Sequence, residues 1–177
     1  VLGEDCLWRR EPLPDHVLAA LTRAFVLPAS AEKEAVHVSL TVTVHRDTVG
    51  GRRDMAVSLE EALRCPEQRL NATQRVRELY SQASAFGDQR NAVAEDDLTE
   101  SGEWLVDGER TARPFDWFKL RVGPVTVAAT ARYGAGRTAE EQAAVVTDVL
   151  KGVGFVAAAV DRRGSLDGAD GKADGDE

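Results

Sequence analysis

The sequence predicts an α+β fold, in which a mainly antiparallel sheet of four to five strands is packed by three to four amphipathic helices. Three observations carry this prediction. Apolar and polar residues alternate over 35–45 and again over 115–133, which is typical of half-buried strands. Other segments place apolar residues at helical spacing. The strands cluster and do not alternate regularly with helices, which favours antiparallel pairing.

The first half of the chain predicts a helix, a strand and two more helices. The first helix opens at Leu13-Pro-Asp15 and ends before Pro28. Its apolar stripe consists of Val17, Leu18, Leu21, Ala24 and Phe25. The strand over 35–45 follows, and a loop with a Gly50-Gly51 hinge leads into a helix over 52–65. Asn71 and Gln74 form a capping pair that predicts another helix, ended by Gly87.

The second half predicts two short strands around Ser101-Gly102, then the hairpin 115–133 with its turn at Gly123-Pro124. Thr138 and Glu141 form a capping box for a helix that ends near Lys151-Gly152. The apolar run 154–160 adds a final strand or helical turn. We therefore expect one domain over 1–160, followed by a disordered acidic tail over 161–177 that has little to bury.

Charge and composition exclude several classes of partner. The formal net charge is −8, which disfavours nucleic acid and bare anionic membrane surfaces. No run approaches the length of a bilayer span, so no transmembrane segment is expected in this chain. The chain begins at Val1 without a methionine, which leaves room for a preceding signal peptide or lipid anchor.

The two cysteines, Cys6 and Cys65, leave two alternatives open. In an exported protein they should pair, and a loop of about 60 residues would then contribute roughly 4 kcal/mol of stability. In a cytosolic protein they would be two unrelated buried thiols. They lack CxxC spacing, and the scattered histidines lack ligand spacing, so neither a metal site nor a cofactor is predicted.

Two sets of residues are candidate binding sites. The first is the polar face of the strand over 35–45, a row of hydroxyls flanked by imidazoles: His37, Ser39, Thr41, Thr43 and His45. It either lines a groove for a polar ligand or is the solvated side of the sheet. The second is an aromatic and basic patch that would contact a protein or glycan: Trp104, Arg113, Trp117, Lys119 and Arg121. Trp117 lies on the face opposite Phe118, either under a helix or exposed.

Catalytic signatures are sparse. The sequence has no GxSxG, SxxK or HExxH motif. The acidic residues Glu95, Asp96, Asp97, Glu100 and Glu103 either supply general acid and base groups to a hydrolase or form a solvated acidic loop. The first hypothesis is therefore non-enzymatic, and a carboxylate-dependent hydrolase acting on an envelope substrate is the alternative.

Cys6 and Cys65, taken as a pair, and the closing pattern over 118–153 carry a resemblance. Strand, glycine turn, small-residue strand and alanine-rich helix are similar to the end of small exported proteins and lipoproteins of actinobacteria, including extracytoplasmic sensor domains attached to signalling kinases. The resemblance implies a secreted or membrane-anchored domain that binds a protein partner or small envelope ligand in envelope sensing or signalling. A cytosolic protein-interaction domain is the third hypothesis.

Overall fold

A computed structural model describes residues 1–82, 96–107, 109 and 111–170. Its centre is a seven-stranded sheet, and each pair of neighbouring strands is antiparallel. The spatial order is β1-β2-β7-β6-β5-β4-β3. The strands are β1 (Val17–Leu27), β2 (Val36–His45), β3 (Gln68–Arg69), β4 (Gln74–Ser81), β5 (Asp96–Val106), β6 (Arg113–Val122) and β7 (Val125–Arg132).

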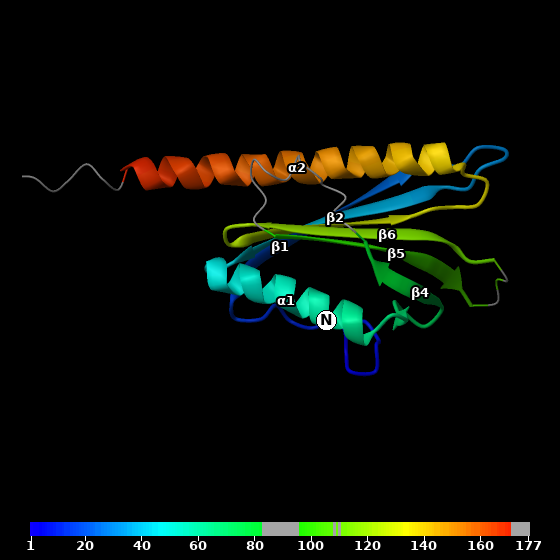
Figure 1. Ribbon diagram of the computed structural model, residues 1–177, viewed down its shortest axis with the longest axis horizontal. Coiled ribbons are helices and arrows are strands. Elements are labelled where there is room, and N and C mark those ends of the chain that lie inside the picture. Colours follow the sequence, from blue (N-terminus) through cyan, green and yellow to red (C-terminus); the bar gives the residue numbers. More distant parts are fainter. Residues whose placement is uncertain (83–95, 108, 110, 171–177) are drawn as a thin grey trace, which may run out of the picture.

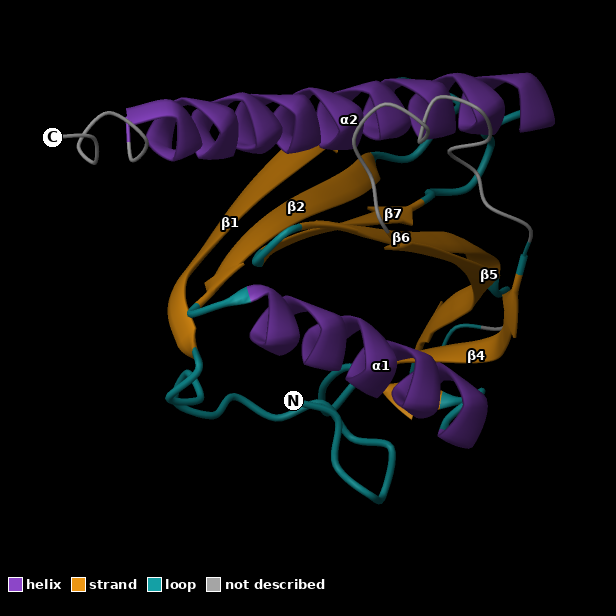
Figure 2. Cartoon of the chain, turned by 60° about the vertical axis from the view of Figure 1, so that its left-hand side comes forward, coloured by secondary structure: helices purple, strands orange, loops and turns teal. Residues whose placement is uncertain are grey.

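The sheet curves into a half-barrel with one helix on each face. Helix α1 (Thr48–Arg64) lies on the concave side, and the long helix α2 (Ala139–Asp170) lies along the convex side (Figures 1 and 2). The predicted fold class is wrong in its strand and helix numbers. The sheet has seven strands instead of four to five, and the described ranges contain two helices instead of three to four.

The helix predicted after Pro14 is the edge strand β1. Leu21 and Phe25 satisfy the spacing of a helix stripe, but they also lie on one face of a strand. In the structure β1 pairs with β2 along nearly its whole length, with Leu21 opposite Val42 and Phe25 opposite Val38. Backbone pairing with β2 therefore decides between two periodicities that this apolar segment satisfies equally.

The helix predicted to open at Asn71 is also wrong, because this segment forms strand β4. Asn71 Oδ1 accepts hydrogen bonds from the backbone amides of Thr73 and Gln74, each at 2.9 Å. A helix N-cap makes the same kind of bond, but here the bonds close the turn between β3 and β4. Residues 83–87 of the predicted helix lie outside the described residues.

The two short strands predicted around Ser101-Gly102 are one continuous strand, β5. Its neighbour β4 carries a register shift between Arg77 and Tyr80, and Glu78 there has a φ of 54°. A Cβ on Gly102 would stand 2.8 Å from the Arg77 carbonyl oxygen. Glycine therefore lets β5 run unbroken beside the bulge in β4.

Other predicted elements are present with small changes. Strand β2 and the hairpin of β6 and β7 occupy the predicted ranges, and Gly123 takes a φ of 53° in the two-residue turn. In the capping box the Glu141 amide donates to Thr138 Oγ1 at 3.2 Å, and the Thr138 amide donates to Glu141 Oε2 at 3.0 Å. Helix α1 starts earlier than predicted, because Asp47 caps it by accepting from the Gly50 amide at 2.7 Å.

The main apolar core lies between the convex face of the sheet and α2. Phe118 and Leu120 of β6 are each 2% exposed there, and Val153 and Ala157 of α2 are fully buried. The end predicted for this helix near Lys151-Gly152 is wrong, because α2 continues to Asp170. It therefore includes the apolar run 154–160 and part of the segment expected to be a tail. Residues 171–177 lie outside the described ranges.

The stretch Ala139–Val160 also meets the length and composition criteria for a membrane-spanning helix, with a mean hydropathy of 1.8. No such segment is expected from the sequence alone. In the structure this stretch packs along the sheet through Val153 and Ala157.

The N-terminal segment is attached to the end of α1 by a disulfide between Cys6 and Cys65. Trp8 Nε1 also donates to Gln68 Oε1 at 2.8 Å. This segment therefore lies close to the open side of the half-barrel, below α1 in Figure 2.

Candidate functional site: the concave cavity

The concave face of the sheet and α1 border a cavity of about 700 Å³. This volume is in the range of small-molecule sites. Side chains from β1, β2, β4, β5, β6, β7, α1 and the N-terminal segment line it. The strand periodicity of two explains the lining, because every second residue of each strand faces the concave side.

Most of the predicted polar row lines this cavity. Ser39, Thr41, Thr43 and His45 are among its walls, whereas His37 is exposed and is not. Strand β7 extends the row, because Thr126 lies opposite Thr43 and Thr130 lies opposite Ser39. Ser39 Oγ and Thr130 Oγ1 are 2.6 Å apart.

The predicted aromatic and basic patch divides into separate parts. Trp117 and Lys119 line the cavity together with the polar row. The guanidinium of Arg113 lies 5.2 Å from the centre of the Trp104 ring, and neither residue lines the cavity. Arg121 is 2% exposed and pairs with Asp96 at 2.6 Å. The structure thus unites two of these residues with the polar row.

A buried polar network joins α1 to the sheet. Asp54 Oδ2 is 2.8 Å from Lys119 Nζ, and Thr126 Oγ1 donates to it at 2.7 Å. Lys119 Nζ also donates to Ser58 Oγ at 2.8 Å. Burial by itself would raise the pKa of Asp54, but Lys119, Thr126 and His45 outweigh it and hold the pKa below its ordinary value.

His45 completes this network at the edge of the sheet. It is 2% exposed, and its Nε2 lies 3.3 Å from Asp54 Oδ2. Its ring stacks on His16 with centroids 6.0 Å apart. Burial lowers the pKa of His45 although Asp54 opposes this shift. We therefore treat this imidazole as neutral near pH 7.

The network joins α1 to the sheet, and Lys119 is not arranged in it to activate Ser58 as a nucleophile. Lys119 donates to both Asp54 and Ser58, so its nitrogen is not placed to take a proton from the Ser58 hydroxyl. Among the residues that the structure describes, no group of three or more histidine, cysteine or acidic side chains is arranged to hold a metal ion.

The predicted acidic loop is part of strand β5, and its members have different surroundings. Asp96 pairs with Arg121, and Glu103 Oε2 pairs with Arg77 on the convex side at 3.0 Å. Asp97 alternates with Asp96 onto the other face, and Glu95 lies outside the described residues.

Glu100 differs from the other acidic residues because it is buried without a partner. Its side chain lines the cavity and is 5% exposed, and it forms no hydrogen bond or ion pair with the described part of the chain. Burial raises its pKa to about 7. Among the described members of this set, Glu100 is therefore the acidic residue that the fold leaves buried in the cavity with unused hydrogen-bonding capacity.

Asp54, Ser58 and Thr126 are functional-site residues that the sequence patterns did not predict. A signal for two of them was present, because Asp54 and Ser58 are four residues apart and lie beside the apolar positions of the amphipathic helix. Their hydroxyl and carboxylate groups on a buried helix face require partners inside the fold. Thr126 carries no such signal.

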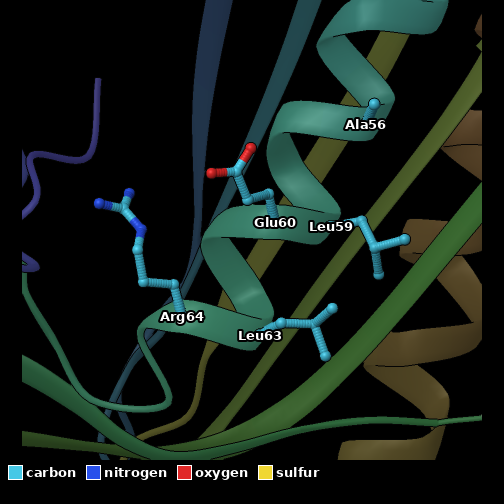
Figure 3. Close-up of a pocket in the computed structure, with 5 residues that line it drawn as sticks. All are labelled: Ala56, Leu59, Glu60, Leu63 and Arg64. Carbon is cyan, nitrogen blue, oxygen red and sulfur yellow. The ribbon is translucent and has the colours of Figure 1, made fainter.

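A second concavity lies on the outer surface of α1. Figure 3 shows Ala56, Leu59 and Leu63 on one side of the helix and Glu60 and Arg64 on the other. Leu59 is 45% exposed and Leu63 is 75% exposed. This surface offers a few exposed leucines and no buried polar group, so the concave cavity is the better candidate site.

Comparisons with known proteins do not identify this site. No protein-family model matches the chain, and no curated protein matches it. A solved structure of a Pseudomonas aeruginosa protein of unknown function is similar over 78% of this chain and 85% of its own, with 12% sequence identity and a TM-score of 0.43.

Proposed function

We propose that this chain is a non-enzymatic binding domain, and that its ligand occupies the cavity between the concave face of the sheet and α1. The observation that carries this proposal is the cavity itself, whose volume is about 700 Å³. Two independently predicted sets of residues meet in its walls, the hydroxyl row of β2 and the residues Trp117 and Lys119 of β6.

The side chains that line the cavity indicate which kind of ligand it would hold. Hydroxyl groups from β2 and β7 lie along one part of the concave face, including Thr41, Thr43 and Thr130. Aromatic and aliphatic side chains, among them Trp117 and Leu79, form another part. A small amphipathic molecule, with an apolar body and a polar end, would satisfy both surfaces.

The compartment forms part of the same proposal. A disulfide between Cys6 and Cys65 is the kind of bond that persists in oxidising surroundings, so we place the domain outside the cytoplasm, where it binds an envelope ligand and takes part in sensing or signalling. The carboxylate-dependent hydrolase is less well supported, because Asp96 and Glu103 are already paired with arginines.

A cavity-filling variant tests the location of the site. Ala128 lies on the concave face between Thr41 and Lys119, and it lines the cavity. We expect Ala128→Phe to abolish binding of small amphiphiles that raise the melting temperature of the wild-type protein. The matched control is Ala56→Phe on the exposed side of α1, which should leave binding unchanged.

Isothermal titration calorimetry with a panel of amphiphiles carrying hydroxyl, carboxylate or ammonium ends gives the measurement. Unchanged affinity in Ala128→Phe would place the site elsewhere. A panel in which no compound binds the wild-type protein would contradict the proposal as a whole.

A further inference from the structure

Glu100 is a buried carboxyl group that the fold itself does not satisfy. Its side chain is 5% exposed and lines the cavity, and the described residues supply it with neither a hydrogen bond nor an ion pair. An unpaired buried charge is costly, and folded proteins normally avoid it. Such a group is therefore better explained by a partner that arrives from outside the chain.

The neighbour of Glu100 across the sheet is Trp117. The two residues are directly opposite in the pairing of β5 with β6, and both line the cavity. Opposed side chains on one face of an antiparallel pair are in contact range. Phe115, two residues away along β6, also lines the cavity. A carboxylate beside an aromatic ring offers a cation both an ion pair and the negative face of a π system.

We propose that the ligand of the concave cavity carries a primary ammonium group on an apolar body, with Glu100 accepting its hydrogen bonds beside the Trp117 ring. This inference rests on the proposed function, since it names the ligand class of the same cavity. The aliphatic and aromatic walls would hold the apolar body, and the hydroxyl row would remain available to any further polar group.

The other charged groups in the cavity do not favour an anionic ligand. Lys119 is already engaged by Asp54, and Arg132 donates to Gln74 and lies over the Trp104 ring. Arg53 is exposed to solvent. The terminal amino group of Val1, another lining residue, donates to the Arg9 carbonyl oxygen at 2.9 Å. The titratable side chains that line the cavity with Glu100 are His16, His45, Arg53, Asp54, Glu61, Lys119 and Arg132.

The proposal predicts that binding of an ammonium ligand depends on pH, and this dependence can be measured. Because burial raises the pKa of Glu100 to about 7, the carboxyl is largely protonated at pH 6 and largely ionised at pH 8. An ammonium ligand must displace that proton, so its affinity should fall by about tenfold between pH 8 and pH 6. A neutral ligand of the same length would show no such fall from this group.

The test compares 1-octylamine, 1-octanol and octanoate by calorimetric titration at pH 6 and pH 8. We expect octylamine to bind the wild-type protein at least tenfold more tightly than octanol at pH 8. Glu100→Gln should remove that preference and its pH dependence. Glu103→Gln is the matched control, because this carboxylate of the same strand pairs with Arg77 on the convex side, and it should behave as wild type.

Equal binding of octanol or octanoate, or full octylamine affinity in Glu100→Gln, would overturn the ammonium assignment. If Ala128→Phe still abolished that binding, the cavity would remain the site and the ligand class alone would be wrong. If none of the probes bound, both the ligand class and the proposed cavity function would be contradicted.

Discussion

At the scale of single residues, the concave side contains carboxylates whose surroundings push their pKa values in opposite directions. Asp54 has Lys119, Thr126 and His45 around it, and together they hold its pKa below the ordinary value against the effect of burial. Glu100 has burial alone, and its pKa rises to about 7. The first carboxylate therefore holds α1 on the sheet, while the second is available to a ligand.

Removing the cation of the network should destabilise the fold. Lys119→Met leaves Asp54 without its ion-pair partner in a site where the lysine is 8% exposed, so we expect a loss of about 3 kcal/mol in the free energy of unfolding. Urea denaturation gives the measurement. Lys151→Met removes an exposed pair with Asp148 and should cost less than about 0.5 kcal/mol.

The double variant Asp54→Asn with Lys119→Met should cost less than the sum of the single changes, because neither residue is then left as an unpaired charge. Strict additivity would show that the pair does not act as a unit.

Glu100 should make stability depend on pH in a defined direction. Its pKa in the folded protein is about 7, which lies above the ordinary value of 4.5. Its contribution to the free energy of unfolding is therefore complete below about pH 4.5 and is lost as the pH rises through 7. Glu100→Gln removes this loss. The stability of the variant relative to wild type should therefore increase by about 2 to 3 kcal/mol from pH 4 to pH 8.

His45 has a lowered pKa and acts in the opposite direction, but it is present in both proteins and cancels in the difference. Denaturation curves at several pH values measure the effect. A difference that does not vary with pH would show that Glu100 does not titrate near neutrality in the folded protein.

At the scale of elements, local sequence signals identify some segments completely and leave others ambiguous. Strand β2 alternates apolar and polar residues over its whole length and is rich in β-branched residues, which is the pattern of a strand. The segment of β1 has apolar residues at both spacings, and the Asn71 turn makes hydrogen bonds that a helix start would also make. Pairing with distant strands then decides the outcome, and no local rule contains that information.

The contact between α1 and the β6–β7 turn gives a prediction at this scale. A Cβ on Gly51 would stand 2.8 Å from the Gly123 carbonyl oxygen, whereas a Cβ on Gly152 of α2 would meet nothing within 4 Å. Alanine is favoured over glycine within a helix by about 1 kcal/mol. Gly152→Ala should therefore stabilise the protein by about 0.5 to 1 kcal/mol, whereas Gly51→Ala should destabilise it by about 1 to 3 kcal/mol.

Thermal unfolding of both variants measures the contrast between these two helical glycines. If Gly51→Ala were as stabilising as Gly152→Ala, the result would contradict the close approach of α1 to the β6–β7 turn.

At the scale of the whole molecule, the disulfide connects the N-terminal segment to the end of α1, 59 residues further along the chain. A closed loop of this length restricts the unfolded chain, so reduction should lower the free energy of unfolding by about 4 kcal/mol. Intact mass after thiol alkylation of the unfolded protein checks the bond, with and without prior reduction. We expect both cysteines to be blocked until reduction.

Free alkylation of both thiols before reduction would remove the support for a location outside the cytoplasm. The cytosolic interaction domain would then become the stronger hypothesis.

The candidate site was only partly predictable, because its walls come together through the strand order and the curvature of the whole sheet. The alternation in β2 and β6 places Thr41 and Thr43 on one face of their strand and Trp117 and Lys119 on one face of theirs. It contains no information about strand order or curvature. Because β7 lies between β2 and β6 and the sheet bends, these faces meet inside one cavity. Glu100 joins them only through the pairing of β5 with β6.

The sequence by itself determined the strand over 36–45, the hairpin around Gly123-Pro124 and the capped start of α2, because their signals lie within a few neighbouring residues. Only the tertiary structure decided that 17–27 and 74–81 are strands and that the polar face of β2 is the inner one. The physical reason is that hydrogen bonds between distant strands set both the strand order and the direction of curvature. Those bonds also determine which carboxylate is left buried without a partner.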